Sequence, residues 1–206
     1  MDNIYLIMNK PLGYVCSAVS DSHKTVYELL TPELQALVRG AKRGHRLHTV
    51  GRLDADTSGL LLFTTDGQFS HFLTAPESGV EKTYEVELEN DVSLEEQKRY
   101  INIVRAGVAL PAEKKAAEEV AGPGELEFVS ERVCRIRIRE GKFHQVRRTF
   151  LAVGNKVVRL GRLAVGGVLL PAEGELPPGK YRELYEEEIQ LLNYSKMATG
   201  LEQARP

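Results

Sequence analysis

The sequence has no apolar segment long enough to cross a membrane. A membrane-spanning helix takes about 18 or more consecutive apolar residues, and no run in the chain approaches that length. A secretory signal pattern is also missing, because the apolar run from Ile4 to Met8 is short and no basic region precedes it. These absences predict a cytoplasmic protein that does not contact membranes.

Cysteine is scarce as well. The 206 residues include two, Cys16 and Cys134, which lie far apart and outside any Cys-x-x-Cys pattern. A disulfide framework or a zinc site needs paired or clustered thiols, so both side chains are expected to be ordinary reduced thiols.

The net charge of −2 says little by itself, but the distribution of charge is uneven. Residues 39–52 contain five Lys or Arg and no acid, and residues 132–162 contain ten against one acid, Glu140. Two basic blocks in a nearly neutral protein predict a positive surface for a polyanion, provided that folding brings the blocks together. The alternative is that they are solvated faces on unrelated sides of the molecule.

Apolar periodicity predicts the main elements of structure. Lys82–Glu89 and Cys134–Arg139 alternate between apolar and polar residues, which is typical of half-buried strands. Ser93–Glu96 forms a capping box that opens a helix. A further helix is expected over Lys142–Val153, and residues 109–124 are expected to be a connection with one short strand. Strands and helices alternate without a regular βαβ rhythm, which favours an α+β protein with a mixed, mainly antiparallel sheet.

The length suits one large domain, which we expect to cover residues 1–192. Residues 193–206 are polar and lack apolar periodicity. They are therefore expected to form a disordered tail.

The stretch from Val50 to Thr64 combines charge with a core element. Its head, Gly51–Gly59, is rich in turn-forming residues and leads directly into Leu60–Phe63, which has the length and makeup of a buried strand. This order brings one arginine and two aspartates close to the core, and buried charge is costly unless it is paired. Such sites usually have a function, and we expect Asp54 to be the working group.

Three chemical interpretations of this head fail on the sequence. Asp-x-Asp-x-Ser-Gly resembles the start of a calcium-binding loop, but the twelfth position, where a bidentate Glu is needed, is Thr65. An aspartyl-phosphate phosphotransferase needs more acids to hold magnesium, yet Asp91 is the only aspartate after Asp66. Ser58 lacks the nucleophile elbow of a serine hydrolase. A structural role, in which Asp54 caps Ser58 in a turn, stays open.

Several motifs in order along the chain carry a resemblance to a known family. The three central ones, Gly51-Arg52-Leu53-Asp54, Lys82-Thr83-Tyr84 and Gly141 to Arg148, together resemble the core motifs of pseudouridine synthases. Two more landmarks look closest to the ribosomal small-subunit type of that family; they are Asn9-Lys10-Pro11-x-Gly13-Tyr14 and Val153-Gly154-Asn155 with Gly166-Gly167. The resemblance extends from about Leu6 to Leu191.

The resemblance implies a pseudouridine synthase fold in which helices flank the sheet and a cleft lies at its centre. It implies that the protein converts uridine to pseudouridine in ribosomal RNA, with no metal or cofactor, and that small-subunit RNA is favoured. Large-subunit RNA is the alternative substrate, and a non-catalytic RNA-binding factor for ribosome assembly is the alternative function. The expected partner is ribosomal RNA or a partly assembled subunit, and a monomer is expected.

The start of the sequence departs from the pattern of the family. Members of the small-subunit type commonly carry an N-terminal S4-like RNA-binding module, whereas this sequence starts almost directly at Asn9. We expect the module to be absent, either because the subtype lacks it or because the chain is a fragment. Both options leave the RNA target open.

The resemblance also assigns roles to single residues. Asp54 is the expected nucleophile, Arg147 its expected ion-pair partner and Tyr84 the platform on which the extruded uracil stacks. Arg52 is expected to fill the place that the base leaves. Asp56 is expected to brace the turn at residues 57–59. Contacts to the RNA backbone are expected from Lys10, Lys82, Arg43, Arg46, Lys142, His144 and Arg148.

Some of these residues have plausible structural roles too. Tyr84 shares a strand face with apolar residues and could be a core tyrosine. His144 could be a structural residue, and Lys10 could brace the cleft instead of contacting RNA.

Overall fold

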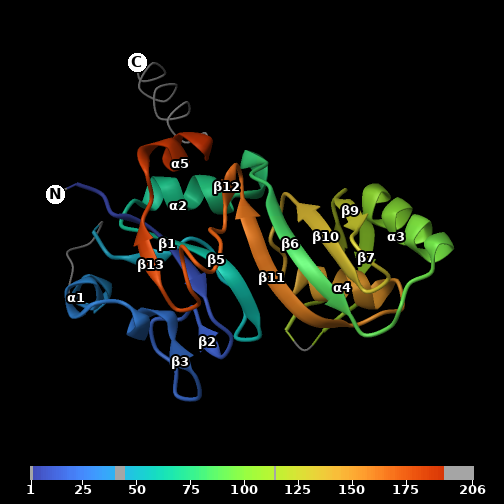
Figure 1. Cartoon of the computed structure of the whole chain (residues 1–206), viewed down its shortest axis with the longest axis horizontal. Helices are drawn as coiled ribbons and strands as arrows, with labels where there is room; N and C mark the ends of the chain where they lie inside the picture. Colours follow the sequence, from blue (N-terminus) through green and yellow to red (C-terminus); the bar gives the residue numbers. More distant parts are fainter. Residues whose placement is uncertain (1, 40–44, 114, 193–206) are drawn as a thin grey trace.

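The computed structural model describes residues 2–39, 45–113 and 115–192. A nine-stranded sheet runs through this part of the chain in the order β13-β1-β5-β11-β6-β10-β9, with β4 added to β5 and β12 added to β11 (Figure 1). Its strands are β1 (Tyr5–Lys10), β4 (His48–Thr49), β5 (Thr57–Thr64), β6 (Lys82–Leu88), β9 (Glu125–Phe128), β10 (Val133–Ile138), β11 (Val157–Val165), β12 (Val168–Leu169) and β13 (Tyr181–Glu183).

Two small sheets and several helices complete the fold. The small sheets pair β2 (Tyr14–Val15) with β3 (Lys24–Thr25) and β7 (Val108–Leu110) with β8 (Glu119–Ala121). The α-helices are α1 (Pro32–Arg39), α2 (Gly67–Thr74), α3 (Leu94–Ala106), α4 (Gln145–Ala152) and α5 (Glu186–Leu191), and the 3-10 helices are η1 (Val26–Leu29) and η2 (Pro76–Ser78).

The central sheet is mixed. β5 and β11 are parallel, while β1, β6, β9, β10 and β13 pair with their neighbours in antiparallel fashion. The predicted α+β class with a mixed, mainly antiparallel sheet is therefore confirmed.

β5 is the best buried strand of the sheet, as its apolar run requires. Successive side chains of a strand point to opposite faces, so Leu60 and Leu62 pack into one core cluster while Leu61 and Phe63 pack into another. The first cluster includes Phe69 of α2, and the second includes residues of η1. Because β5 is covered on both faces, the loop that precedes it is anchored on a rigid element.

A third core cluster lies under the other half of the sheet. It joins apolar residues of β6 and β10 to Tyr100 and Val104 of α3 and to Val146 and Phe150 of α4. Figure 1 shows α3 and α4 in this half, beside β9 and β10, whereas α1, α2 and α5 belong to the half around β1 and β5. β11 joins the halves, since it pairs with both β5 and β6.

Two predicted elements differ from the observed ones. The helix expected from Lys142 begins at Gln145, because His144 has a left-handed backbone (φ 46°) that an α-helix cannot contain. Residues 109–124 contribute to two short strands, β7 and β8, where one was expected. The predicted tail at residues 193–206 lies outside the described residues, and the domain boundary at residue 192 stays a prediction.

Within the described ranges, no helix has both the length and the apolar character that a membrane-spanning segment needs.

The close approach of β5 to β11 at Gly59 generates a stability prediction. Gly59 has φ 103°, and a Cβ there would overlap the carbonyl oxygen of Arg162 and lie 2.8 Å from its nitrogen. Gly59→Ala should therefore lower the free energy of unfolding by about 2 kcal/mol or more, measured by urea denaturation. Gly67→Ala is the matched control, because a Cβ at Gly67 meets nothing within 4 Å and its φ is not positive. Equal effects of the two substitutions would contradict the packing explanation.

Candidate active site

The loop from Gly51 to Asp56, which leads into β5, is held in place by the N-terminal segment. The backbone amide of Gly13 donates to the carbonyl of Ala55 at 2.7 Å. The Sγ of Cys16 lies 3.3 Å from the amide nitrogen of Leu53 and 3.4 Å from its carbonyl oxygen. The landmark that starts at Asn9 thus acts as a support for the Asp54 loop.

Lys10 makes the strongest of these supporting contacts. Its Nζ donates to the carbonyl oxygens of Asp54 (3.0 Å), Thr57 (2.7 Å) and Pro11 (3.1 Å), and its side chain is 0% exposed. Burial lowers the pKa of Lys10, against a smaller opposing effect of Cys16 and Asp54. The expected contact of Lys10 with RNA is contradicted by this burial, and the structure supports its alternative role as a brace.

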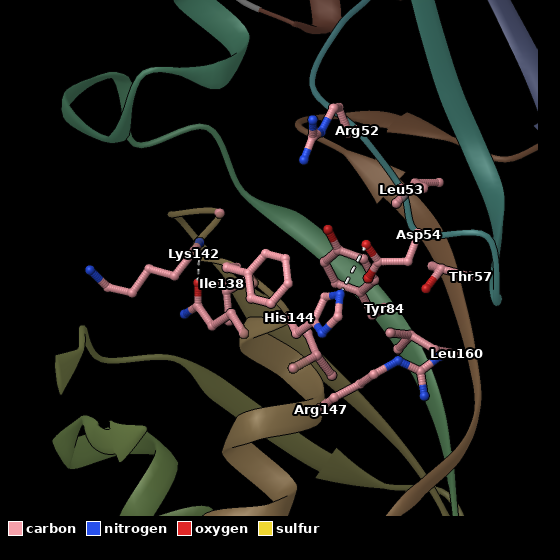
Figure 2. A pocket seen from close by; sticks show the side chains of 14 residues that line it. Arg52, Leu53, Asp54, Thr57, Tyr84, Ile138, Lys142, His144, Arg147 and Leu160 are labelled. Atoms are coloured by element: carbon pink, nitrogen blue, oxygen red, sulfur yellow. Dashed lines mark hydrogen bonds and ion pairs between the residues drawn. The ribbon is translucent and has the colours of Figure 1, made fainter. Parts of the chain in front are cut away.

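Asp54 lies at the wall of a cavity of about 220 Å³. Figure 2 shows its carboxylate directed toward His144 and Tyr84, with Leu160 and Thr57 on the neighbouring wall. Asp54 is half-buried, so it is reachable from the cavity. Its carbonyl accepts hydrogen bonds from Lys10 and from the amide of Thr57, which fixes the backbone behind the carboxylate.

His144 lies between two carboxylates. Its Nε2 is 3.4 Å from Oδ1 of Asp54, and its Nδ1 is 3.1 Å from both carboxylate oxygens of Glu113. The ring stacks on Phe143 with centroids 3.8 Å apart. The sequence predicted a phosphate contact for His144, and the contact with Asp54 was missed because no periodicity reveals a left-handed residue at the start of a helix.

Arg147 does not pair with Asp54, and that expectation is corrected. Its Nη2 lies 2.9 Å from Oδ2 of Asp56 and also donates to the carbonyl of Asp56, while Nη1 donates to the carbonyl of Val157. Asp56 was expected to brace the turn at residues 57–59, but its observed side-chain partner is Arg147. One side chain of α4 thereby holds the loop beside the carboxylate of Asp54.

Tyr84 and Arg52 both line the cavity, as expected for groups that contact a substrate. Arg52 is exposed on the loop above Asp54 (Figure 2). Two buried polar atoms of the same wall, Oγ1 of Thr57 and Nε of Arg147, have no hydrogen-bond partner among the described residues. Unsatisfied buried groups are rare in folded proteins, so their presence here favours a site that a polar ligand completes.

The remaining expected RNA contacts divide by burial. Arg148 is 1% exposed and donates to Glu119 (2.6 Å) and to the carbonyls of Pro111, Ala117 and Phe143. Its donors are used inside the protein, so the expectation that it binds RNA is contradicted. Lys82 is buried too, but it lines a cavity, so its expected contact with RNA stays a prediction.

Other expected contacts are compatible with RNA binding or cannot be placed. Lys142 lies at the cavity and pairs with Glu119 and Glu140. Arg46 is exposed. Arg43 lies outside the described residues.

The second basic block is largely neutralised on the face of the sheet that carries Arg135, Arg137 and Arg139. Arg135 and Arg137 pair with glutamates of the adjoining strands β6 and β9, and Arg139 pairs with Glu81, the residue before β6. The N–O distances are 3.1–3.7 Å. Those glutamates lie between the two basic blocks in the sequence. Cross-strand pairing brings them face to face with the arginines. For this strand the alternative interpretation, a solvated face, holds.

Metal ligands are not clustered here: among the described residues, no group of three or more His, Cys, Asp or Glu side chains is placed to hold a metal ion.

Residues 4–152, which contain Asp54, Tyr84 and Arg147, match the family described as RNA pseudouridylate synthase. This chain belongs to the RNA pseudouridylate synthase family. Its three central motifs meet in space, since the Asp54 loop, Tyr84 of β6 and the segment from Gly141 to Arg147 line one cavity.

Individual relatives agree with this assignment. The chain is 43% identical over 185 residues to "Ribosomal small subunit pseudouridine synthase A" of Escherichia coli, covering 90% of this chain and 72% of the relative. It is 38% identical over 188 residues to the protein of the same name from Haemophilus influenzae, covering 91% and 73%. A crystal structure described as a pseudouridylate synthase superposes with a TM-score of 0.79 at 39% identity, covering 93% of this chain and 74% of that one. The expected fold is thereby confirmed.

Some residues of this pseudouridylate synthase site were missed by sequence reasoning. Leu160 of β11 and Ile138 of β10 form apolar parts of the cavity wall. A cross-strand register could have placed Leu160 and Arg162 on the face of Tyr84, because they pair with Val86 and Tyr84 of β6. The sequence does not reveal that register, since the strands are more than 70 positions apart.

The bracing role of Lys10 can be tested by Lys10→Met. This substitution leaves three carbonyl oxygens without their buried donor, so it should lower the free energy of unfolding by about 2–4 kcal/mol and reduce activity. The dependence of RNA affinity on salt should keep its wild-type slope, because no phosphate contact is lost. Lys180→Met, which removes an exposed charge, is the stability control. A reduced salt slope with unchanged stability would restore Lys10 as an RNA contact.

Proposed function

We propose that this protein converts uridine to pseudouridine in small-subunit ribosomal RNA, with Asp54 as the nucleophile. Its membership of the RNA pseudouridylate synthase family supports the reaction. The relatives that carry the name of a ribosomal small-subunit enzyme, at identities of 38–43%, support the substrate. A ribosomal RNA substrate supports a cytoplasmic location, and we propose that the protein acts there as a monomer.

The isomerisation balances without electrons or a further reactant. The C1'–N1 bond of the nucleotide breaks, a bond forms between C1' and C5, C5 loses a proton and N1 gains one. A carboxylate nucleophile divides this rearrangement into easier steps by holding the reacting fragment covalently while the base turns. The protein has to supply a fixed carboxylate, a place for the base to turn and exclusion of competing water.

The position of Asp54 is the observation that carries the proposal. Its backbone is fixed by Lys10 and Thr57, and its carboxylate opens into a cavity whose walls combine Tyr84 and Leu160 with unsatisfied polar atoms. Flat apolar and aromatic surfaces accept a base, and the polar atoms are available to its exocyclic oxygens and its ribose. Tyr84 supplies a stacking surface, worth on the order of 1–3 kcal/mol per base.

A uridine in structured RNA reaches Asp54 only after extrusion from its stack, which costs a few kcal/mol. Arg52 is exposed at the cavity rim on the same loop as Asp54, so it is placed to occupy the vacated position. Arg147, through Asp56, holds the loop that carries both residues. Lys142 and His144 are the proposed contacts with RNA at the cavity, His144 also positioning the Asp54 carboxylate, and the exposed Arg46 is a further proposed contact.

Asp54→Asn tests the enzymatic proposal. The substitution keeps shape and removes the nucleophilic charge, so it should abolish tritium release from small-subunit ribosomal RNA made with 5-tritiated uridine, while RNA affinity stays within a few-fold of wild type. Asp91→Asn, an exposed aspartate remote from the cavity, is the matched control. Large-subunit RNA as the only responding transcript would favour the alternative substrate. Absence of release by the wild type from either RNA, free or in immature subunits, would leave a non-catalytic binding factor.

The face that binds RNA can be tested by two single-charge removals. Lys142→Ala should weaken RNA binding and lower its salt slope by about 1, because Lys142 lies at the cavity. Arg135→Ala removes the same charge from the opposite face of the sheet, where Glu85 pairs with it, and should leave the slope unchanged. Filter-binding titrations at several salt concentrations measure both. The reverse ranking would put the RNA on the other face.

A further inference from the structure

A second, smaller cavity adjoins the one at Asp54. It has a volume of about 120 Å³ and shares Arg52, Tyr84 and Gly141 with the first cavity. Lys82 and Arg162 lie on its wall, together with apolar side chains that include Leu62, Leu73 and Val165. Lys82 opens the second motif and was expected to contact the RNA backbone, whereas Arg162 belongs to none of the three motifs, and the chemistry at Asp54 uses neither cation.

The strand register puts the two cations on one face. Arg162 of β11 lies directly opposite Tyr84 of β6, and Lys82 precedes Tyr84 by two residues, so all three side chains leave the sheet on the cavity side. Both cations are more than nine-tenths buried, with exposed fractions of 7% for Lys82 and 5% for Arg162. The strand register fixes their backbone positions on adjacent strands.

Neither cation has an anionic partner in the part of the chain that the structure describes. Arg162 uses Nε to donate to the carbonyl of Leu60 at 2.8 Å, and its Nη2 has no hydrogen-bond partner among those residues. The side chain of Lys82 has no hydrogen-bond or carboxylate partner among the described residues. The carboxylate that reaches the cavity, Glu140, is occupied by the amide of Gly122, by Gln145 and by Lys142.

Two buried cations without an anionic partner are unfavourable unless a ligand of opposite charge compensates them. Burial and, to a smaller extent, the neighbouring charge of Arg162 together lower the pKa of Lys82 to about 8. Arg52, Tyr84, Arg162 and Glu140 are the other ionisable groups around the cavity, so positive charge predominates there. An apolar residue of similar size would be less costly than Lys82 at this position. Uncompensated buried charge beside an active site indicates a ligand of opposite sign.

We propose that Lys82 and Arg162 bind one phosphate of the RNA backbone next to the extruded uridine. The proposal rests on the proposed function, because it uses the cavity at Asp54 as the place of the base. A phosphate is covalently within one nucleotide of that base, and the two cavities share the wall formed by Arg52 and Tyr84. The small cavity, at about 120 Å³, has room for a phosphate group. Its cations then serve to fix the sugar of the target nucleotide against Asp54.

The decisive variant is Lys82→Met, studied in the full chain carrying Asp54→Asn so that binding is measured without turnover. Loss of the contact should lower the salt slope of binding to a small-subunit ribosomal RNA transcript by about 0.7 and weaken affinity several-fold. Lys82→Arg should retain the slope. Lys98→Met, which removes an exposed charge on α3, should leave affinity and slope unchanged. The thermal stability of Lys82→Met should equal or exceed that of its parent, which separates a lost ligand contact from a damaged fold.

A spectroscopic measurement distinguishes the source of the phosphate. The Cε resonance of Lys82, followed by NMR over a pH series, should titrate near pH 8 in the free protein and at higher pH with uridine 3'- or 5'-monophosphate. Uridine should not move it. An equal response to inorganic phosphate, together with an unchanged RNA salt slope in Lys82→Met, would mark a site for free phosphate and overturn the assignment to the RNA backbone.

Failure of this proposal and failure of the proposed function look different. An unchanged salt slope with a Lys82 resonance that no phosphate compound moves overturns the phosphate site, whether or not the wild type releases tritium. A reduced slope in a protein that releases no tritium supports the site and contradicts the enzymatic function. In active protein, Lys82→Met should raise KM for the RNA more than it lowers kcat, because the lysine holds the substrate and does not take part in the chemistry.

Discussion

The hydrogen bonds from the buried ammonium group of Lys10 to the carbonyls of Asp54 and Thr57 are the contacts on which the site depends. They tie the first strand to the loop that enters the central strand, so Asp54 occupies one position relative to the sheet. A carboxylate that has to meet a single atom of a bulky RNA needs such a fixed backbone, because an error of about 1 Å in position can cost two orders of magnitude in rate. A buried lysine is costly in itself, but here its donors are satisfied by three backbone carbonyls.

The cost of leaving a charge without a partner also explains how charge is arranged over the rest of the molecule. On the outer face of β10, Arg135 and Arg137 lie opposite glutamates and are largely neutralised in a solvated layer. On the cavity face, Lys82 and Arg162 lack such partners among the described residues. Two sets of basic residues that look alike in the sequence therefore differ in environment, since the first is paired with glutamates and the second has no anionic partner among the described residues. Net charge conceals this difference, because the outer pairs cancel and the inner cations are few.

The backbone conformation at the start of α4 decides which residues contact the two aspartates of the Asp54 loop. His144 adopts a left-handed conformation, which costs a non-glycine residue about 1 kcal/mol and delays the helix until Gln145. The result directs the imidazole of His144 toward Asp54 and leaves Arg147, one turn later, to hold Asp56. Both aspartates of the loop are thus contacted from one short segment. The strain is offset by the stacking on Phe143 and by the carboxylates on either side of the ring.

The sequence by itself determined the local elements and the identity of the loop. Apolar runs and alternation placed β5, β6 and β10, and the capping box placed α3, because these signals act over a few residues. Motif order placed Asp54, Tyr84 and Arg147 at one cavity. Only the tertiary structure decided which partner each charge has: Arg147 contacts Asp56 and not Asp54, Arg148 and Lys10 are buried, and Arg162 joins Lys82. Such pairings depend on strand register and on distances between segments far apart in the chain, and neither is encoded in local pattern.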